Sequence, residues 1–229
     1  MKQRQTAGGI AALGLSGLFV GLLLLLAVVL PGRGLGPHTL DHPATGIPFV
    51  ASSSLPVIIA LVYIGIALAF VPMMLALYQR LREAAPAMSQ VAVVASLVAA
   101  GLFLAYGMIP MVGNPAVVTI YQDDAARGGA VYLALRLTAN AMSAGALFAA
   151  GWAISLVGWA ALRAGGLPKV LSSIMLLGGI SMILSFALLS VGLIGLLLAP
   201  IWSAWLGVVL LRERAHVMDT RRRPVVAQA

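Results

Sequence analysis

The run that decides the fold of this chain is Leu22-Leu23-Leu24-Leu25-Leu26-Ala27-Val28-Val29-Leu30. A helix or strand built from it would be apolar on every side, which indicates lipid rather than water as its surroundings. A membrane β-barrel would instead alternate apolar and polar residues over ~10 positions. The composition agrees, since 62% of the 229 residues are hydrophobic and only 9% are charged, against about a quarter in soluble domains. The sequence therefore predicts an all-α integral membrane protein.

Working outward from this run, the chain divides into apolar segments that are long enough to cross a bilayer. We expect a bundle of six transmembrane helices, with spans at 8–30, 56–78, 89–112, 129–162, 170–188 and 193–211. The first span should be a retained helix, because its apolar run exceeds that of a signal peptide and no A-x-A site follows. Residues 1–212 are thus expected to form a single transmembrane domain, followed by a basic tail at 213–229.

The last two spans lie in one apolar stretch from Val170 to Leu211. As one helix it would measure about 63 Å, twice the ~30 Å core of a bilayer, so it must fold back. We expect the turn between Leu189 and Ile194, where Gly192 lies.

Basic residues are distributed unevenly about the six predicted spans. Eleven of the 14 fall on one side: Lys2, Arg4, Arg80, Arg82, Arg163, Lys169, Arg212, Arg214, Arg221, Arg222 and Arg223. Cytoplasmic loops carry such an excess, so both termini are predicted to be cytoplasmic. The outer side should then hold two loops, an irregular one at 31–55 and another at 113–127. Rich use of Ala, Gly, Leu and Arg suggests a bacterium, and hence its cytoplasmic (inner) membrane.

The fourth and fifth predicted spans are joined by Gly158-Trp159-Ala160-Ala161-Leu162-Arg163-Ala164-Gly165-Gly166-Leu167-Pro168-Lys169-Val170-Leu171, and Leu176-Leu177-Gly178-Gly179 follows. This segment resembles an uncharacterised bacterial multi-pass membrane family, classed as a domain of unknown function. That family shows Tyr-Leu-x-x-Arg-Ser-Gly, then x-x-Pro-Arg-x-Leu-Gly and a Gly-rich span. This chain departs from the pattern at Trp159, Ala160, Ala164, Lys169 and Ser172. The resemblance implies several spans, and it implies no activity and no catalytic residues.

Acidic residues and histidines are missing from the predicted spans. None contains Asp, Glu or His, which disfavours a carboxylate proton relay, bis-histidine haem and Ser–His proteolysis within the membrane. The chain has no cysteine, so disulfides and thiol chemistry are excluded. No phosphate-binding motif is present. We therefore expect no cofactor and a non-catalytic protein.

One polar stripe stands at the start of the fourth predicted span. Arg136, Asn140 and Ser143 are spaced so that they share a helix face. Arg136 is expected about 10 Å above the hydrocarbon core, because ~20 residues that end near Leu162 already cross it. Interfacial anchoring is the favoured interpretation of Arg136. A ligand or lipid-headgroup site made by the stripe is one alternative, and pairing of Arg136 with Asp123 or Asp124 is another.

The first outer loop contains His38, Asp41 and His42. Imidazole and carboxylate groups together can bind a divalent metal ion such as zinc. The spacing H-x-x-D-H in a Pro-rich loop is a weak metal signature, and a solvated loop is the favoured interpretation.

Small residues favour close helix packing. Gly14, Gly17 and Gly21 lie near one face of the first span, with GxxxG spacing between the last two. Packing within the chain is favoured over packing against another membrane protein. In the fourth span, Gly151 and Gly158 stand at heptad spacing and should act similarly.

Together these features favour a non-catalytic membrane component, such as a subunit, assembly factor or regulator that acts through helix packing. The main alternative is a carrier or binding protein for an apolar or lipid-like molecule, with Arg136 or Asn140 at the mouth of a cavity. An enzyme with an outer metal site is a third hypothesis. The expected partners are the lipid bilayer, with anionic lipid at the basic tail, and, as an alternative to packing within the chain, another membrane protein. Nucleic acid is not expected.

Overall fold

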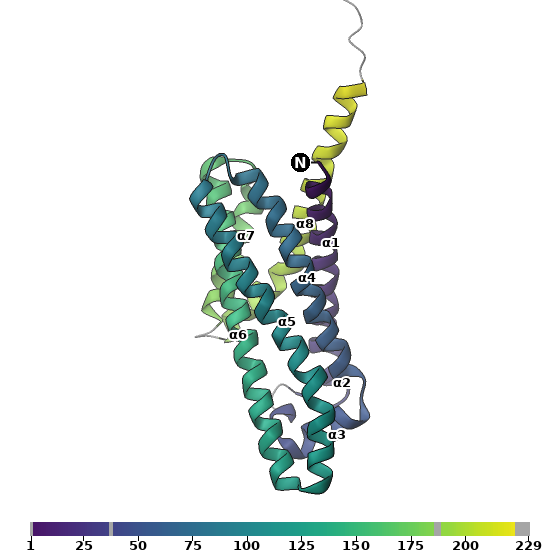
Figure 1. Cartoon of the computed structure of the whole chain (residues 1–229). Coiled ribbons are helices and arrows are strands. Elements are labelled where there is room, and N and C mark those ends of the chain that lie inside the picture. The colour runs from purple at the N-terminus through teal and green to yellow at the C-terminus, as the bar shows by residue number, and fades with distance from the viewer. Residues whose placement is uncertain (1, 37–38, 186–188, 223–229) are drawn as a thin grey trace, which may run out of the picture.

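The structure is a computed structural model that describes residues 2–36, 39–185 and 189–222, with side chains in 5–36, 39–185 and 193–212. It is all-α (Figure 1). The elements in chain order are α1 (Lys2–Leu24), the π-helix η1 (Leu25–Val29), α2 (Leu30–Gly32), the 3-10 helix η2 (Thr39–Asp41), α3 (Pro43–Ser52), α4 (Leu55–Leu81), α5 (Pro86–Asp123), α6 (Ala125–Ala164), α7 (Lys169–Leu184) and α8 (Leu189–Arg222).

Five helical segments within the described residues are long and apolar enough to cross a membrane: Gln5–Gly32, Leu55–Leu81, Pro86–Asp123, Ala125–Ala164 and Leu193–Arg212. The helix α7 is apolar but has only 16 residues, about 24 Å at the helical rise. The chain therefore has the pattern of a multi-pass membrane protein.

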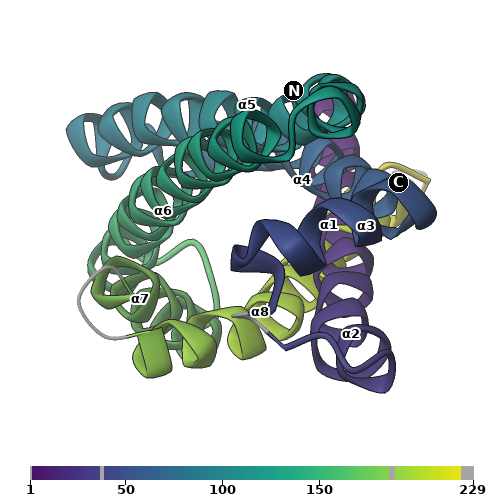
Figure 2. The same cartoon turned by 90° about the horizontal axis from the view of Figure 1, so that it is seen from below.

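The long helices form a closed ring. Each packs mainly on two neighbours in the order α1, α4, α5, α6, α7 and α8, and α8 returns to α1. Figure 2 views the ring from one end and shows the helices arranged about a common centre. A ring of this kind leaves space along its axis wherever side chains do not meet. In this protein, side chains pack closely along one half of the axis and leave a cavity along the other half.

The filled half contains the main hydrophobic core. Trp202 of α8, Phe70 of α4 and Ile154 of α6 are all at most 1% exposed there. Glycine lets the helices approach closely, since a Cβ added at Gly151 of α6 would lie 2.6 Å from the carbonyl oxygen of Gly179 in α7. The predicted packing role of Gly151 is therefore confirmed.

The turns at the filled end follow the motif that carried the family resemblance. Gly165 ends α6 with a φ of 78°, a left-handed conformation that glycine adopts without strain. Pro168 then precedes α7. The guanidinium of Arg80, at the end of α4, donates a hydrogen bond through Nε to the carbonyl oxygen of Gly166. This bond ties the α4–α5 end of the ring to the α6–α7 turn.

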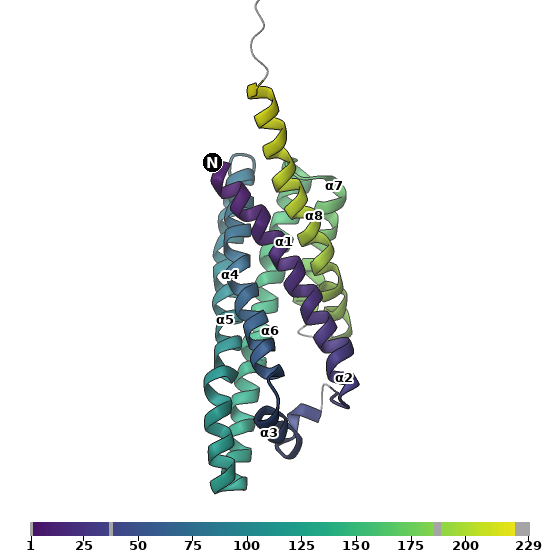
Figure 3. The ribbon, with the colours of Figure 1, turned by 90° about the vertical axis from the view of Figure 1, so that its right-hand side faces the viewer.

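At the opposite end, the prediction of a loop at 113–127 was wrong. The helix α5 runs on to Asp123, and α6 begins at Ala125 with the Asp124 carboxylate accepting hydrogen bonds from the amides of residues 126 and 127. Packing of α5 against α6 keeps Pro110 and Pro115 within one helix. These helices have 38 and 40 residues, about 57 and 60 Å, so their hairpin extends past the other helices (Figure 3).

The prediction that residues 31–55 are irregular was wrong in part. The described part of that loop contains η2 and the ten-residue helix α3, which begins at Pro43 and includes Pro48. Proline is well tolerated in a first helical turn because no hydrogen bond is lost there. Ile47 of α3 packs with Val117 and Tyr132 in a small second core, and this contact holds α3 against the α5–α6 hairpin.

The fold-back between the last two helices was predicted too late in the chain. The helix α7 ends at Leu184, and the Ser185 hydroxyl donates to the carbonyl of Met182 at this end. The helix α8 begins at Leu189 and contains Gly192, because glycine alone does not stop an apolar helix. The predicted tail also begins as helix, since α8 continues to Arg222; residues 223–229 lie outside the described residues.

Candidate functional site

The unfilled half of the ring axis is a cavity of about 590 Å³. Its walls come from α1, η1, α2, α4, α5, α6 and α8, and its cover includes Leu35, Gly36, Leu40, Phe49 and Val50. Most lining side chains are apolar, such as Leu26, Ile59 and Ile109. The π-helix η1 forms part of this wall, and π-helical turns are often found at functional sites.

One ion pair stands at the cavity. The Nε of Arg136 in α6 lies 3.2 Å from Oδ1 of Asp41 in η2, with the side chains 31% and 46% exposed. This pair overturns the suggested partners Asp123 and Asp124 for Arg136. The cause is tertiary, because docking of η2 and α3 brings Asp41 to α6, whereas Asp124 caps the start of α6. In the described residues the other guanidinium nitrogens of Arg136 have no bonded partner, and Arg136 lines the cavity.

The cover of the cavity is held by a buried hydrogen bond. The hydroxyl of Tyr132 in α6 donates to the carbonyl oxygen of Leu40 over 2.7 Å, and Tyr132 is only 4% exposed. Gly46 of α3 lies directly against this ring, because a Cβ added there would overlap the Tyr132 hydroxyl. Arg136 and Tyr132 thus fasten η2 and α3 onto α6 from one side of the cavity.

Deeper in the cavity, two tyrosines and a serine form a polar cluster. The rings of Tyr63 in α4 and Tyr106 in α5 meet edge to face, with centroids 4.3 Å apart. Ser143 of α6 lies near the Tyr63 hydroxyl. Three helices therefore place hydroxyl groups together at the level where the cavity meets the packed core.

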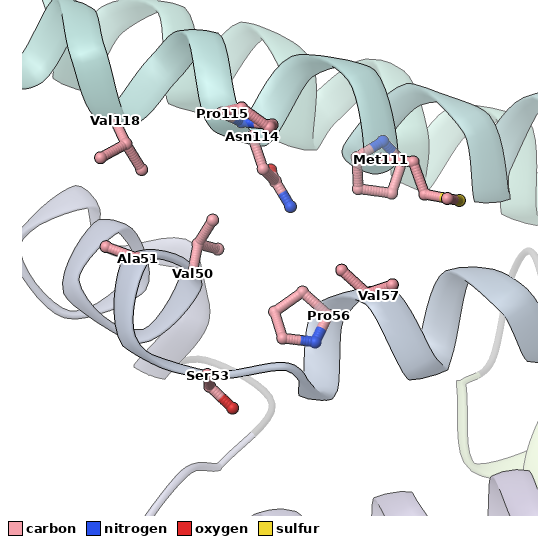
Figure 4. A pocket seen from close by; sticks show the side chains of 10 residues that line it. Val50, Ala51, Ser53, Pro56, Val57, Met111, Asn114, Pro115 and Val118 are labelled. Carbon is pink, nitrogen blue, oxygen red and sulfur yellow. The ribbon is translucent and has the colours of Figure 1, made fainter.

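A second cavity of about 370 Å³ lies outside the first, between α3, the start of α4 and α5. Figure 4 shows Asn114 reaching from α5 into this space, with Pro56 and Val57 of α4 opposite. Val50, Pro56, Pro110 and Asn114 line both cavities. The two spaces are therefore neighbours that share part of their walls.

The structure divides the predicted polar stripe. Arg136 lines the central cavity and Ser143 reaches the Tyr63 cluster, whereas Asn140 is exposed and is not among the lining residues. The helical spacing predicts that these residues share one face of the helix. It does not predict which residues of other helices each of them contacts.

The predicted metal ligands do not form a cluster among the described residues. Asp41 is paired with Arg136, His42 is exposed, and His38 lies outside the described residues. In 39–185 and the other described ranges, no group of three His, Cys, Asp or Glu side chains stands close enough to hold a metal ion. The site with His38 stays a prediction.

The glycines Gly14, Gly17 and Gly21 do not pack within the chain, which corrects the favoured expectation for them. A Cβ added at any of the three would meet no atom within 4 Å. The close approaches of α1 are made earlier, at Gly8 against Ala76 of α4 and at Gly9 near Leu211 of α8. The reason is the crossing of α1 with its neighbours, which turns this glycine face outward.

Sequence reasoning missed the aromatic residues of the cavity. Tyr63, Tyr106 and Tyr132 all line it. A signal was present, because a tyrosine inside an apolar span needs a partner for its hydroxyl group. The sequence does not reveal that all three face one space.

Comparison with protein families gives one match. Residues 13–213 match the family described as Domain of unknown function (DUF4386), which agrees with the resemblance seen around the α6–α7 turn. Searches of curated proteins and of solved structures find no match to this chain. The match covers most of the chain, which therefore belongs to the DUF4386 family.

Proposed function

We propose that this protein binds one apolar or lipid-like molecule in the central cavity and serves as its carrier or binding protein. The observation that carries the proposal is the cavity itself, about 590 Å³ with apolar walls and Arg136 on one side. Ligand cavities typically measure ~300–1,000 Å³ and combine apolar walls with a few polar groups. The cavity also makes the carrier interpretation stronger than the non-catalytic subunit that composition alone favoured.

The chemistry of the walls favours a single hydrocarbon chain that ends in an oxygen-bearing head group. Apolar walls favour hydrocarbon over water. The remaining N–H groups of Arg136 suit a carboxylate, phosphate or carbonyl oxygen, since charge-assisted hydrogen bonds of this kind are strong. Asp41 keeps the site near neutrality. The Tyr63 cluster would then lie near the hydrocarbon end of the molecule.

We further propose that the protein has six spans, with both termini in the cytoplasm and α7 as the fifth, in a bacterial cytoplasmic membrane. The basic residues at the α4–α5 and α6–α7 turns support this orientation. The short length of α7 is compatible with a shallow or locally thinned crossing. In this orientation the cavity lies in the outer half of the membrane, and the α5–α6 hairpin with α3 projects outside.

A test of the carrier function uses the protein purified from native membranes in a mild detergent. Bound small molecules are extracted and measured by mass spectrometry. Ala139 lines the cavity and is 8% exposed, so Ala139→Phe should fill the space. Ala134 is exposed on the same helix, and Ala134→Phe is the matched control.

We expect near-stoichiometric ligand in the wild type and in Ala134→Phe, and loss of it in Ala139→Phe. Thermal unfolding of both variants checks that each remains folded. Equal retention by the two variants, or a wild type that carries nothing, would rule out the cavity as a binding site.

A membrane subunit that acts by helix packing remains a second candidate. The specific observation in its favour is the open glycine face of α1 at Gly14, Gly17 and Gly21, because small residues let a partner helix approach closely. A stoichiometric partner protein in the same purification, lost in Gly17→Leu, would support it.

A further inference from the structure

We infer that the central cavity is entered sideways from the membrane, through the second cavity between α3, α4 and α5, by the hydrocarbon chain of an outer-leaflet lipid. This inference rests on the proposed function, because it assigns a route to the same site. Its first support is continuity, since Val50, Pro56, Pro110 and Asn114 line both cavities. The two spaces therefore share part of their walls.

The backbone at this place is poorly suited to close packing. Pro56 stands in the first turn of α4, while Pro110 and Pro115 stand inside α5. Each proline inside a helix removes one backbone hydrogen bond and bends the helix. The structure shows the outcome as a space of about 370 Å³ beside these residues (Figure 4).

The surroundings favour hydrocarbon over a water-soluble ligand. No charged side chain lines the second cavity in the part of the chain that the structure describes. Val57, at its edge, is 46% exposed, and Val112, on the nearby part of α5, is 69% exposed. Exposed valine side chains on a membrane-spanning helix face lipid at low free-energy cost. In the proposed orientation these residues lie near the outer surface, where lipid chains begin.

Asn114 has a defined place on this route. Its amide group reaches into the second cavity from α5 and also contributes to the wall of the first. An amide can accept and donate hydrogen bonds, so it suits the polar head of a lipid as its chain passes inward. Arg136 would then receive the head group inside the cavity.

A residue on the route that does not touch the bound molecule should change the association and dissociation rates by the same factor. Val57 lines the second cavity only, so Val57→Trp should obstruct passage and leave the equilibrium unchanged. Val94 is 62% exposed on α5 and lines neither cavity, so Val94→Trp is the matched control. Ala51→Trp is a second obstruction, from the α3 side, should Val57→Trp fail to fold.

The experiment uses the full chain in lipid nanodiscs loaded with pyrene-labelled hexadecanoic acid. Release into an excess of unlabelled phospholipid vesicles is followed by stopped-flow fluorescence, and the equilibrium Kd is measured in parallel. We expect Val57→Trp to slow release at least about tenfold with an unchanged Kd, and Val94→Trp to behave as the wild type.

The two proposals fail in different ways. Binding by the wild type with equal release rates in all variants would overturn the lateral route and leave the cavity as the binding site. If Val57→Trp changes the equilibrium Kd by as large a factor as the release rate, the route is also overturned, because Val57 would then belong to the binding site. Absence of binding to the wild type would overturn the proposed function and, with it, the route.

Discussion

The hydrogen bond from Tyr132 to Leu40 allows a quantitative test of how the cavity is covered. Tyr132→Phe removes the donor from a bond of 2.7 Å in which Tyr132 is 4% exposed. The carbonyl of Leu40 then stays buried without a partner whenever η2 and α3 are docked. Leaving a buried acceptor unsatisfied costs about 1–3 kcal/mol. Since each 1.4 kcal/mol is about a tenfold change in equilibrium constant, the open state of α3 should become about 5- to 150-fold more populated.

Hydrogen–deuterium exchange of α3 amides measures this opening. The amide of Gly46 donates to the carbonyl of His42 in the docked state, and such amides exchange when the segment opens. We expect their exchange to accelerate by the factor given above, while amides in the packed half of α4 and α6 stay unchanged. Tyr121→Phe is the control, because the Tyr121 ring packs beside the same small core and its hydroxyl has no bonded partner in the described residues.

An acceleration below about twofold in Tyr132→Phe would refute the argument that this bond holds the cover. An equal acceleration in Tyr121→Phe would show that the effect is not specific to the hydrogen bond between Tyr132 and Leu40. Acceleration across α4 and α6 as well would mean that α3 opens only when the whole protein unfolds.

Three further predictions concern packing, charge and orientation. Gly151→Ala should lower the free energy of unfolding in detergent by about 1–3 kcal/mol, because the added Cβ meets a backbone oxygen. Gly17→Ala should be neutral or stabilising by up to about 1 kcal/mol, because its added Cβ meets no other atom. Equal effects of the two substitutions would contradict the observed helix crossings. Asp41→Asn should tighten binding of hexadecanoate by up to about fivefold, since a partly exposed ion pair is worth at most about 1 kcal/mol, and weaker binding in a titration would oppose an anionic head group at this place. In this cysteine-free chain, Asp123→Cys should react with an impermeant maleimide on intact cells and Glu83→Cys only after lysis; the reverse pattern would invert the proposed topology.

Part of the candidate site could be predicted from the sequence. Arg136 and Ser143 were selected because a charged and a polar residue share one helix face next to a span, and both reach the cavity or its polar cluster. Helical spacing fixes directions within one helix only, so it could not separate these residues from the exposed Asn140. It also could not find Asp41 as the partner of Arg136, because the two stand 95 positions apart.

Some local signals were misleading because tertiary packing outweighed them. The residues from Pro110 to Pro115, with Gly113 and Asn114 between them, are typical of a loop, yet α5 continues through all of them. Pairing with α6 and α3 stabilises this helix, and Val117 is buried just beyond the second proline. In the same way, Gly192 suggested a turn, but α8 contains it and the chain turns earlier.

The sequence by itself determined the class of this protein, an all-α chain with several membrane-spanning segments. The physical reason is that runs such as Leu22 to Leu30 can only be surrounded by apolar matter, and a backbone in lipid must satisfy its hydrogen bonds within its own helix. The tertiary structure decided the order of helices in the ring, the outward face of Gly17 and the cavity beside Arg136. These depend on which helices meet and where they fail to meet, and in an almost uniformly apolar chain that outcome follows from the shapes of packed side chains rather than from polarity along the sequence.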